Sequence, residues 1–153
     1  MDKLSQELSA CACEYLNHAD ERNAKTLFMN EIREISANYK LSPDEIEDRT
    51  GNLPIRCFRY GDMPDNFSYF PVGTSGSDII DMIDDTFAGD YGDEYNSKID
   101  NFIENLKKNP DILEKDFAFD DPVSGVIECE TDTFANYCQY CGWPFEENRN
   151  PQM

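Results

Sequence analysis

Two long stretches of this chain contain no lysine or arginine. Residues 61–97 carry nine acidic side chains without a base, and residues 116–147 carry eight more. Together these 17 acids account for most of the formal net charge of −19. A surface this negative repels DNA, RNA and anionic lipid over a Debye length of roughly 8 Å, and it attracts basic proteins. The sequence therefore argues against direct nucleic-acid binding and favours a basic protein as the partner.

The chain also lacks a long apolar run. No stretch approaches the roughly 20 apolar residues that span a bilayer, and the start, MDKLSQELSA, lacks the continuous apolar core of a signal peptide. We therefore expect a cytoplasmic protein with no membrane contact. In a reducing compartment, its six cysteines point to metal binding or burial more than to disulfides.

Signals of catalysis are sparse. The single histidine, His18, falls in a predicted break between two helices, where a cap or surface role is expected. No G-x-S-x-G, P-loop or H-E-x-x-H pattern occurs. Carboxylate pairs are abundant by composition alone, so none of them identifies an acid and a base. We expect that the protein is not an enzyme.

Length and apolar content predict one folded domain. A chain of 153 residues buries about 68–70% of its unfolded surface. Hydrophobic content of 39%, with ten Phe and eight Tyr, argues against disorder. We predict a single α+β domain over residues 1–153, mainly helical, with a small antiparallel sheet and a C-terminal zinc-knuckle-like element. Residues 1–52 form a helical N-terminal part, and residues 53–153 form an α+β part.

Hydrophobic periodicity and capping signals predict the individual elements. The first 40 residues form two helices with a break at residues 17–19, the second capped by Asp20. Ser42 and Pro43 start a short helix that Gly51 ends. Further helices cover 78–87, capped by Ser77, and about 96–108; strands cover 54–60, 66–72 and 124–130. Pro71 makes the strand at 66–72 an edge strand.

The sharpest local motif is Cys138–Gln139–Tyr140–Cys141–Gly142. Two thiolates separated by two residues can face one tetrahedral Zn²⁺, and the glycine allows a tight turn. The motif resembles one knuckle of a zinc ribbon, without the second C-x-x-C of a ribbon. Eight residues separate Cys129 from Cys138, and Cys57 neighbours Cys129 if their strands pair. We predict a structural zinc held by Cys57, Cys129, Cys138 and Cys141.

Other roles for the thiols stay open. Cys11 and Cys13 compete as ligands, but residues two apart on a helix point about 200° away from each other, and Cys11 falls on the apolar face. In an alternative version of the predicted zinc site, Cys13 or His18 takes the place of one of the four cysteine ligands. Inert burial and a redox dithiol are the remaining alternatives. A thioredoxin-like site places its C-x-x-C near the start of a βαβ unit, which does not fit this motif near the chain end.

The predicted helix at 78–87 separates charged from apolar side chains. Its isoleucines and Phe87 face inward, whereas its aspartates lie on the opposite side. Three of these charges span about 10 Å, or one per roughly 5 Å, against one per roughly 3.4 Å along one strand of duplex DNA. The acids continue through the following loop. The expected partner-binding residues are Asp78, Asp81, Asp84, Asp85, Asp90, Asp93 and Glu94.

Two simpler interpretations of these acids stay open. Acidic side chains often do no more than solvate an exposed helix face. Residues 84–94 are also rich in oxygen ligands for Ca²⁺, but they do not match the alternating D-x-[DN]-x-[DN]-G loop that fixes calcium geometry.

Small size, strong acidity, the cysteine knuckle and the absence of catalytic motifs together resemble phage-encoded anti-CRISPR proteins that act on Cas9-type effectors. The resemblance implies a structural zinc, a location in the bacterial host cytoplasm, and stoichiometric binding to a basic nuclease that blocks nucleic-acid loading. Two alternatives stay open. One is a zinc-stabilised adaptor or regulator of a host protein, and the other is a dithiol oxidoreductase that uses Cys138 and Cys141.

Overall fold

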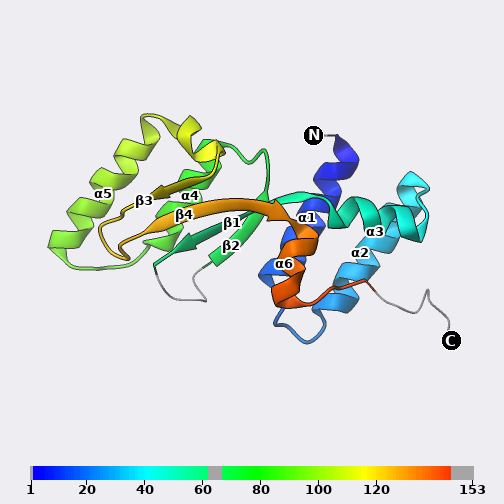
Figure 1. The fold of residues 1–153 in the computed structure, drawn as a ribbon. Helices are drawn as coiled ribbons and strands as arrows, with labels where there is room; N and C mark the ends of the chain where they lie inside the picture. Colours follow the sequence, from blue (N-terminus) through cyan, green and yellow to red (C-terminus); the bar gives the residue numbers. More distant parts are fainter. Residues whose placement is uncertain (1, 62–66, 146–153) are drawn as a thin grey trace. The chain divides into compact units, whose positions relative to one another are not determined.

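The computed structural model of the chain describes residues 2–61 and 67–145 (Figure 1). The elements are α1 (Lys3–Asn17), α2 (Ala24–Tyr39), α3 (Pro43–Gly51), β1 (Pro54–Tyr60), β2 (Phe67–Pro71), α4 (Gly76–Thr86), α5 (Asp93–Lys107), the 3-10 helix η1 (Pro110–Glu114), β3 (Phe117–Phe119), β4 (Ile127–Thr133) and α6 (Phe134–Cys141). Helix exceeds strand, so the predicted α+β, mainly helical class is confirmed. None of the helices in the described ranges is long and apolar enough to cross a bilayer.

Contacts divide the chain into two compact units. Unit 1 comprises Met1–Ile55, Tyr69–Pro71 and Asp132–Met153, and unit 2 comprises Arg56–Ser68 and Val72–Thr131. The boundaries differ from the predicted parts, 1–52 and 53–153, because strands of the sheet pass from one unit to the other. The prediction of a single domain over residues 1–153 stays a prediction.

The strands form one antiparallel sheet in the order β2–β1–β4–β3. β3 pairs with β4, with Phe117 opposite Cys129. Residues 55–58 of the inner strand β1 are each at most 2% exposed. Since successive strand residues point to opposite faces, β1 is buried on both faces. The order confirms that β2, with Pro71, is an edge strand and that the strand of Cys57 neighbours that of Cys129.

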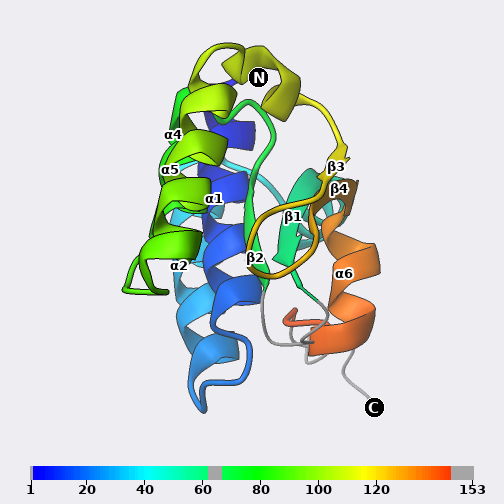
Figure 2. The same cartoon turned by 90° about the vertical axis from the view of Figure 1, so that its left-hand side faces the viewer.

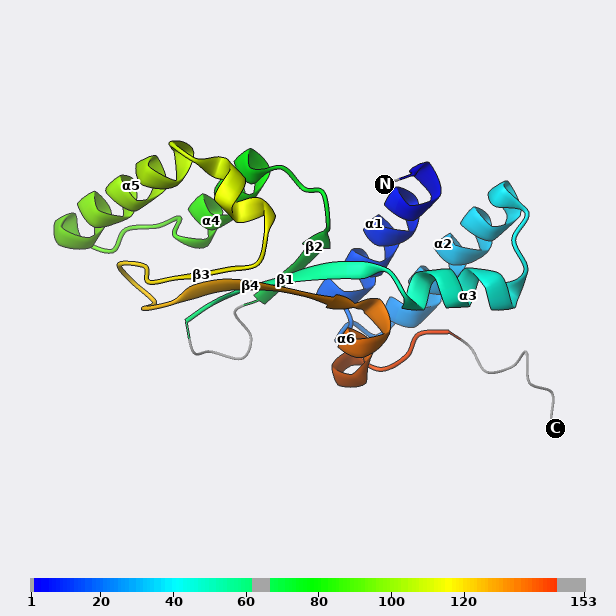
Figure 3. The ribbon, with the colours of Figure 1, turned by 45° about the horizontal axis from the view of Figure 1, so that its top comes forward.

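In unit 2, local contacts position α4. Ser75 caps the helix, because its Oγ accepts the backbone N–H of Asp78 at 3.1 Å; the prediction that Ser77 is the cap was wrong. Only glycine fits at position 76, since a Cβ there would lie 2.1 Å from the carbonyl oxygen of Pro110. α4 packs against η1 and α5 (Figure 3). Phe87 then packs edge-on against Tyr60 of β1, with ring centroids 6.4 Å apart.

In unit 1, α1 and α2 run side by side (Figure 2). An aromatic cluster joins them to α6: the ring centroids of Tyr15 and Phe28 are 5.3 Å apart, and those of Phe28 and Phe134 are 5.7 Å apart. Thr133 caps α6, because its Oγ1 accepts the N–H of Asn136 at 3.2 Å. These contacts fix the position of the C-terminal cysteine motif within this unit.

Several predicted boundaries were wrong. The N-cap of α2 is Asn23 instead of Asp20. α5 begins at Asp93 instead of residue 96, and β4 begins at Ile127 instead of residue 124. The short strand β3 was not predicted. The segment predicted as a zinc-knuckle-like element is instead helix α6, whose last turn carries both cysteines of the motif. A helix forms there because Thr133 provides a cap and the apolar residues that follow recur with helical spacing.

Candidate partner-binding surface and cysteine sites

The seven predicted partner-binding acids all belong to unit 2, and all are exposed. We call them the acidic face; its members are Asp78, Asp81, Asp84, Asp85, Asp90, Asp93 and Glu94. On α4 the opposite side is apolar, with Ile79, Ile80 and Ile83 at most 3% exposed. The predicted separation of charge from apolar side chains on this helix is therefore confirmed. No side-chain hydrogen bond or ion pair engages the four α4 carboxylates within the described residues.

A hydrogen-bonded loop carries the acidic face from α4 to α5. Asp90 Oδ1 accepts the backbone N–H of Gly92 at 2.9 Å and the side-chain amide of Asn96 at 3.1 Å. Asn96 Oδ1 in turn accepts the N–H of Tyr91 at 3.1 Å. The Gly92 N–H, followed by the Asn96 amide, lowers the pKa of Asp90 below its usual value. Asp90 therefore stays ionised while it orders the loop.

The last two acids of the face lie in the first turn of α5, not in the loop where they were expected. The positive end of the helix dipole stabilises carboxylates there. Glu94 also pairs with Lys98, whose Nζ is 3.6 Å from Glu94 Oε1 and 5.6 Å from the ring centroid of Tyr95. Lys98 offsets the charge of Glu94. Sequence analysis missed this pair because Lys98 lies one residue beyond the base-free stretch that was considered.

Two tyrosines are exposed beside these acids. Tyr91 is 39% exposed and Tyr95 is 43% exposed. Tyrosine supplies a large contact area and a hydroxyl with only two rotatable bonds, which makes it common at the energetic centre of protein interfaces. The acidic face therefore offers apolar contact area as well as charge.

The predicted zinc ligands fall into two pairs. Cys57 and Cys129 belong to unit 2, whereas Cys138 and Cys141 belong to unit 1. Among residues 2–61 and 67–145, no three His, Cys, Asp or Glu side chains form a group that could hold a metal ion. A structural zinc takes four ligands, and one pair of thiols does not complete such a site. The four-cysteine site stays a prediction that these contacts do not support.

Cys57 and Cys129 lie on the neighbouring inner strands β1 and β4. Both are at most 2% exposed. Burial raises the pKa of Cys129 to about 11, although the nearby Arg56 guanidinium acts in the opposite direction. Arg56 is itself buried, and its Nη2 donates to the carbonyl oxygen of Lys115 at 2.7 Å. Both thiols are therefore buried core groups, and Cys129 is held in its neutral form.

Cys138 and Cys141 lie three residues apart in the last turn of α6, on one side of the helix. Burial first, and then the neighbouring Cys141, raise the pKa of Cys138 to about 12; burial also raises the pKa of Cys141. The negative end of the helix dipole disfavours a thiolate at this position. Redox dithiols need a lowered thiol pKa, so this environment argues against the oxidoreductase alternative.

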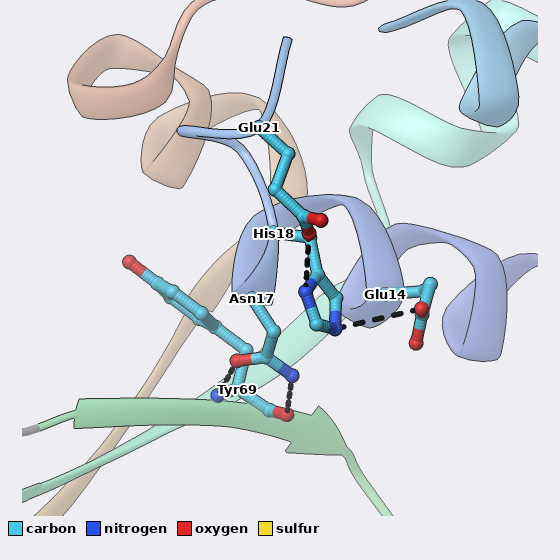
Figure 4. Close-up of polar contacts among 5 residues, drawn as sticks. All are labelled: Glu14, Asn17, His18, Glu21 and Tyr69. Atoms are coloured by element: carbon cyan, nitrogen blue, oxygen red, sulfur yellow. Dashed lines mark hydrogen bonds and ion pairs between the residues drawn. The ribbon is translucent and has the colours of Figure 1, made fainter. Parts of the chain in front are cut away.

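The remaining ligand candidates have structural surroundings. Burial raises the pKa of Cys13 to about 12 and that of Cys11 further, and both thiols lie in the core of unit 1. The backbone of His18 caps α1, as expected for a cap. Its Nδ1 lies 2.6 Å from Glu21 Oε2, and its Nε2 lies 3.5 Å from Glu14 Oε1 (Figure 4).

Sequence analysis missed two side chains that hold unit 1 together. Asn17 bonds both backbone groups of Tyr69: its Nδ2 donates to the Tyr69 carbonyl at 2.9 Å, and its Oδ1 accepts the Tyr69 N–H at 2.8 Å (Figure 4). Trp143 Nε1 donates to Glu47 Oε2 at 3.0 Å, and its ring packs against Gly51, where a Cβ would lie 3.1 Å from the indole. Neither contact has a sequence signal, because each joins residues more than 50 positions apart.

Comparisons with known proteins assign no family. No protein-family model matches the chain, and no curated protein and no solved structure resembles it significantly. The function is therefore inferred from the chemistry of the surfaces and sites of this chain.

Proposed function

We propose that this chain is an acidic protein inhibitor that binds a basic, nucleic-acid-handling protein and blocks its nucleic-acid groove. The observation that carries the proposal is the row of four exposed aspartates on α4, in a stretch with no lysine or arginine from residue 61 to 97. The acidic face presents carboxylates where the partner normally meets phosphates. Binding is then stoichiometric and needs no catalytic residue.

The spacing of the charges suits such a groove. From Asp78 to Asp85, α4 rises about 10 Å. Phosphates on one strand of duplex DNA are roughly 3.4 Å apart, so the acidic face is sparser but of the same order. When a groove lined with Lys and Arg binds such a surface, counterions are released into the solvent, as they are when it binds nucleic acid.

Orientation comes from the end of the acidic face at α5. Asp90 is held by Gly92 and Asn96, so the loop between α4 and α5 loses little freedom on binding. Tyr91 and Tyr95 add apolar contact area beside the carboxylates. Charge alone gives a fast and salt-sensitive encounter, whereas ordered aromatic contacts slow dissociation.

The resemblance to anti-CRISPR proteins names the first partner to test, which is a Cas9-type effector. Its channel for guide and target nucleic acid is positively charged and recognises backbone geometry, so an acidic protein in or beside that channel prevents loading. A zinc-stabilised adaptor with an apolar interface is the alternative, and its partner affinity would depend little on salt.

A pull-down from bacterial lysate tests this proposal. The tagged chain should recover a basic nucleic-acid-handling protein at about 50 mM salt and lose most of it at about 300 mM, because exposed charges are screened. Recovery of no such protein, or recovery that is equal at both salt concentrations, contradicts the proposal. The same binding test with a purified Cas9-type effector shows whether effectors of this class are the partner.

A further inference from the structure

Unit 2 contains a pocket of about 330 Å³ beside the acidic face. Strands β1 and β2 contribute its aromatic side chains, and α4 contributes Met82, Asp85 and Thr86. These three positions are three and four residues apart, so they lie together on one side of the helix. Asp85 also belongs to the acidic face, so the pocket continues that surface.

The accessible apolar part of the pocket is aromatic. Phe67, on the edge strand β2, is 37% exposed, and Tyr60 of β1 is half-buried. Phe58 is 2% exposed and packs against Tyr60, with ring centroids 6.1 Å apart. A ligand in the pocket therefore meets chiefly the ring of Phe67, and the negative face of an aromatic ring attracts a cation.

The polar side chains of the pocket favour a hydrogen-bond donor. The carboxylate of Asp85 makes no side-chain hydrogen bond or ion pair within the described residues. Thr86 Oγ1 donates to the Met82 carbonyl at 2.9 Å, so towards a ligand this oxygen can only accept. The Ser68 hydroxyl can accept or donate. No lysine or arginine is among the described residues that line the pocket, so nothing there repels a cation.

We propose that this pocket binds an arginine side chain of the basic partner, with the guanidinium stacked on Phe67 and hydrogen-bonded to Asp85. The proposal rests on the proposed function, because it assigns one residue type of the partner to one place on the acidic face. A volume near the lower limit of small-molecule sites, roughly 300 Å³, suits a single long side chain.

Arginine fits the pocket better than lysine does. Its guanidinium has five N–H donors and no acceptor, which matches the acceptors of the pocket. It is also planar, so it stacks on aromatic rings and bonds a carboxylate through two parallel N–H groups. In a nucleic-acid groove such an arginine normally contacts a phosphate, so its capture by the pocket removes a phosphate contact.

Two peptides of equal charge test this preference. One is a heptamer of lysine, and the other is the same heptamer with arginine at its centre. In calorimetric titrations of the full chain at about 50 mM salt, both should bind the acidic face, and the arginine peptide should bind about fivefold more tightly. Equal affinities overturn the pocket proposal but leave the proposed function standing. Absence of binding by both peptides contradicts the proposed function as well.

Two variants locate the preference in the pocket. Phe67→Leu removes the ring but keeps an apolar side chain, and Asp85→Asn removes the carboxylate. Each should bring the affinities of the two peptides close to each other. Continued binding of the lysine peptide shows that the variants fold.

Each variant has a matched control. Tyr140→Leu removes a ring that is 82% exposed and lies outside the pocket. Asp81→Asn removes a carboxylate of α4 that does not line the pocket, so it should weaken both peptides alike. Both controls should keep the fivefold preference for arginine.

The remaining outcomes are also decisive. A preference for arginine that persists in Phe67→Leu and in Asp85→Asn places the arginine elsewhere and overturns the assignment. A third heptamer, with leucine at its centre, tests for an apolar occupant. If it binds as tightly as the arginine peptide, the pocket takes an apolar side chain of the partner and the proposal is wrong.

Discussion

The aspartates of α4 and two acids of the second base-free stretch have different contacts. In the second stretch, Asp121 accepts the N–H groups of Val123 and Ser124 at 2.9 and 2.6 Å, and Asp132 accepts the side-chain amide of Asn136 at 2.7 Å. On α4 no such bond engages the aspartates within the described residues. The comparison teaches that a count of acids does not identify a binding surface, whereas the contacts of each carboxylate do.

The largest expected effect is on partner binding. Changing Asp78, Asp81, Asp84 and Asp85 together to Asn should weaken binding to a basic partner about hundredfold, since each exposed charge pair contributes up to about 1 kcal/mol. The matched control neutralises four exposed acids outside the face: Asp20, Glu34, Asp100 and Asp120. Both variants have the same net charge, so equal affinities in a calorimetric titration would show that only total charge matters.

The second effect concerns stability, which should depend on Asp121 and not on the α4 aspartates. Asp121 is 9% exposed, and Asp121→Ala leaves the two N–H groups of its turn without their carboxylate, which should lower the free energy of unfolding by about 2 kcal/mol. The exposed neighbour Asp120 serves as the control, since Asp120→Ala should change the free energy of unfolding by less than about 0.5 kcal/mol. The α4 Asn variant should lose no stability. Urea unfolding measures all three, and a stable Asp121→Ala protein would contradict the contrast.

A third prediction uses the thiols. Burial raises the pKa of Cys129 from 9.0 to about 11, so at pH 8 its thiolate fraction falls about a hundredfold and alkylation by iodoacetamide slows accordingly. A raised pKa means that the folded state holds its proton more tightly. Its contribution to stability is full below pH 9 and is lost as pH rises towards 11. Alkylation as fast as in urea would contradict this burial.

The same sample tests the zinc predicted from the sequence. A site formed by Cys57, Cys129, Cys138 and Cys141 requires one zinc per chain, and Cys57→Ser must then release it and lower the melting temperature. Zinc-free protein with slowly reacting thiols would refute that site and leave the cysteines as core residues.

The smallest expected effect is the response of stability to salt. Raising NaCl from about 20 to about 300 mM screens repulsion among the acids and should raise the free energy of unfolding by about 1 kcal/mol or less. The α4 Asn variant should gain less from salt than the wild type, because fewer like charges remain. A larger gain in the variant would mean that repulsion is not concentrated on α4.

Periodic and capping signals predicted much of this fold. The isoleucines of α4 identified its buried side, and therefore the exposure of its aspartates. Residues 54–60 were predicted as a strand with the bounds that β1 has, and Ser42 caps α3 by accepting the N–H of Glu45 at 3.1 Å. Such features are local, so a single sequence contains them.

Other parts depend on context that the sequence shows only weakly. β3 is three residues long and is defined by its pairing with β4, so it has no period of its own. For α6, the cysteine motif hid a helix signal, namely Thr133 followed by apolar residues at 134, 137, 138 and 141. Asp121 and Ser124, three residues apart, are residue types that favour turns, and Asp121 accepts the N–H of Ser124. Sequence analysis did not use this turn signal.

Displacement of nucleic acid tests the central claim most directly. Labelled nucleic acid bound to the basic partner is titrated with the wild-type chain and with a variant in which the four α4 aspartates are changed to Lys. The wild type should release the label at about one chain per partner, and the variant should release none. Release that is equal for both chains, or wild-type binding that leaves the nucleic acid in place, would contradict the claim.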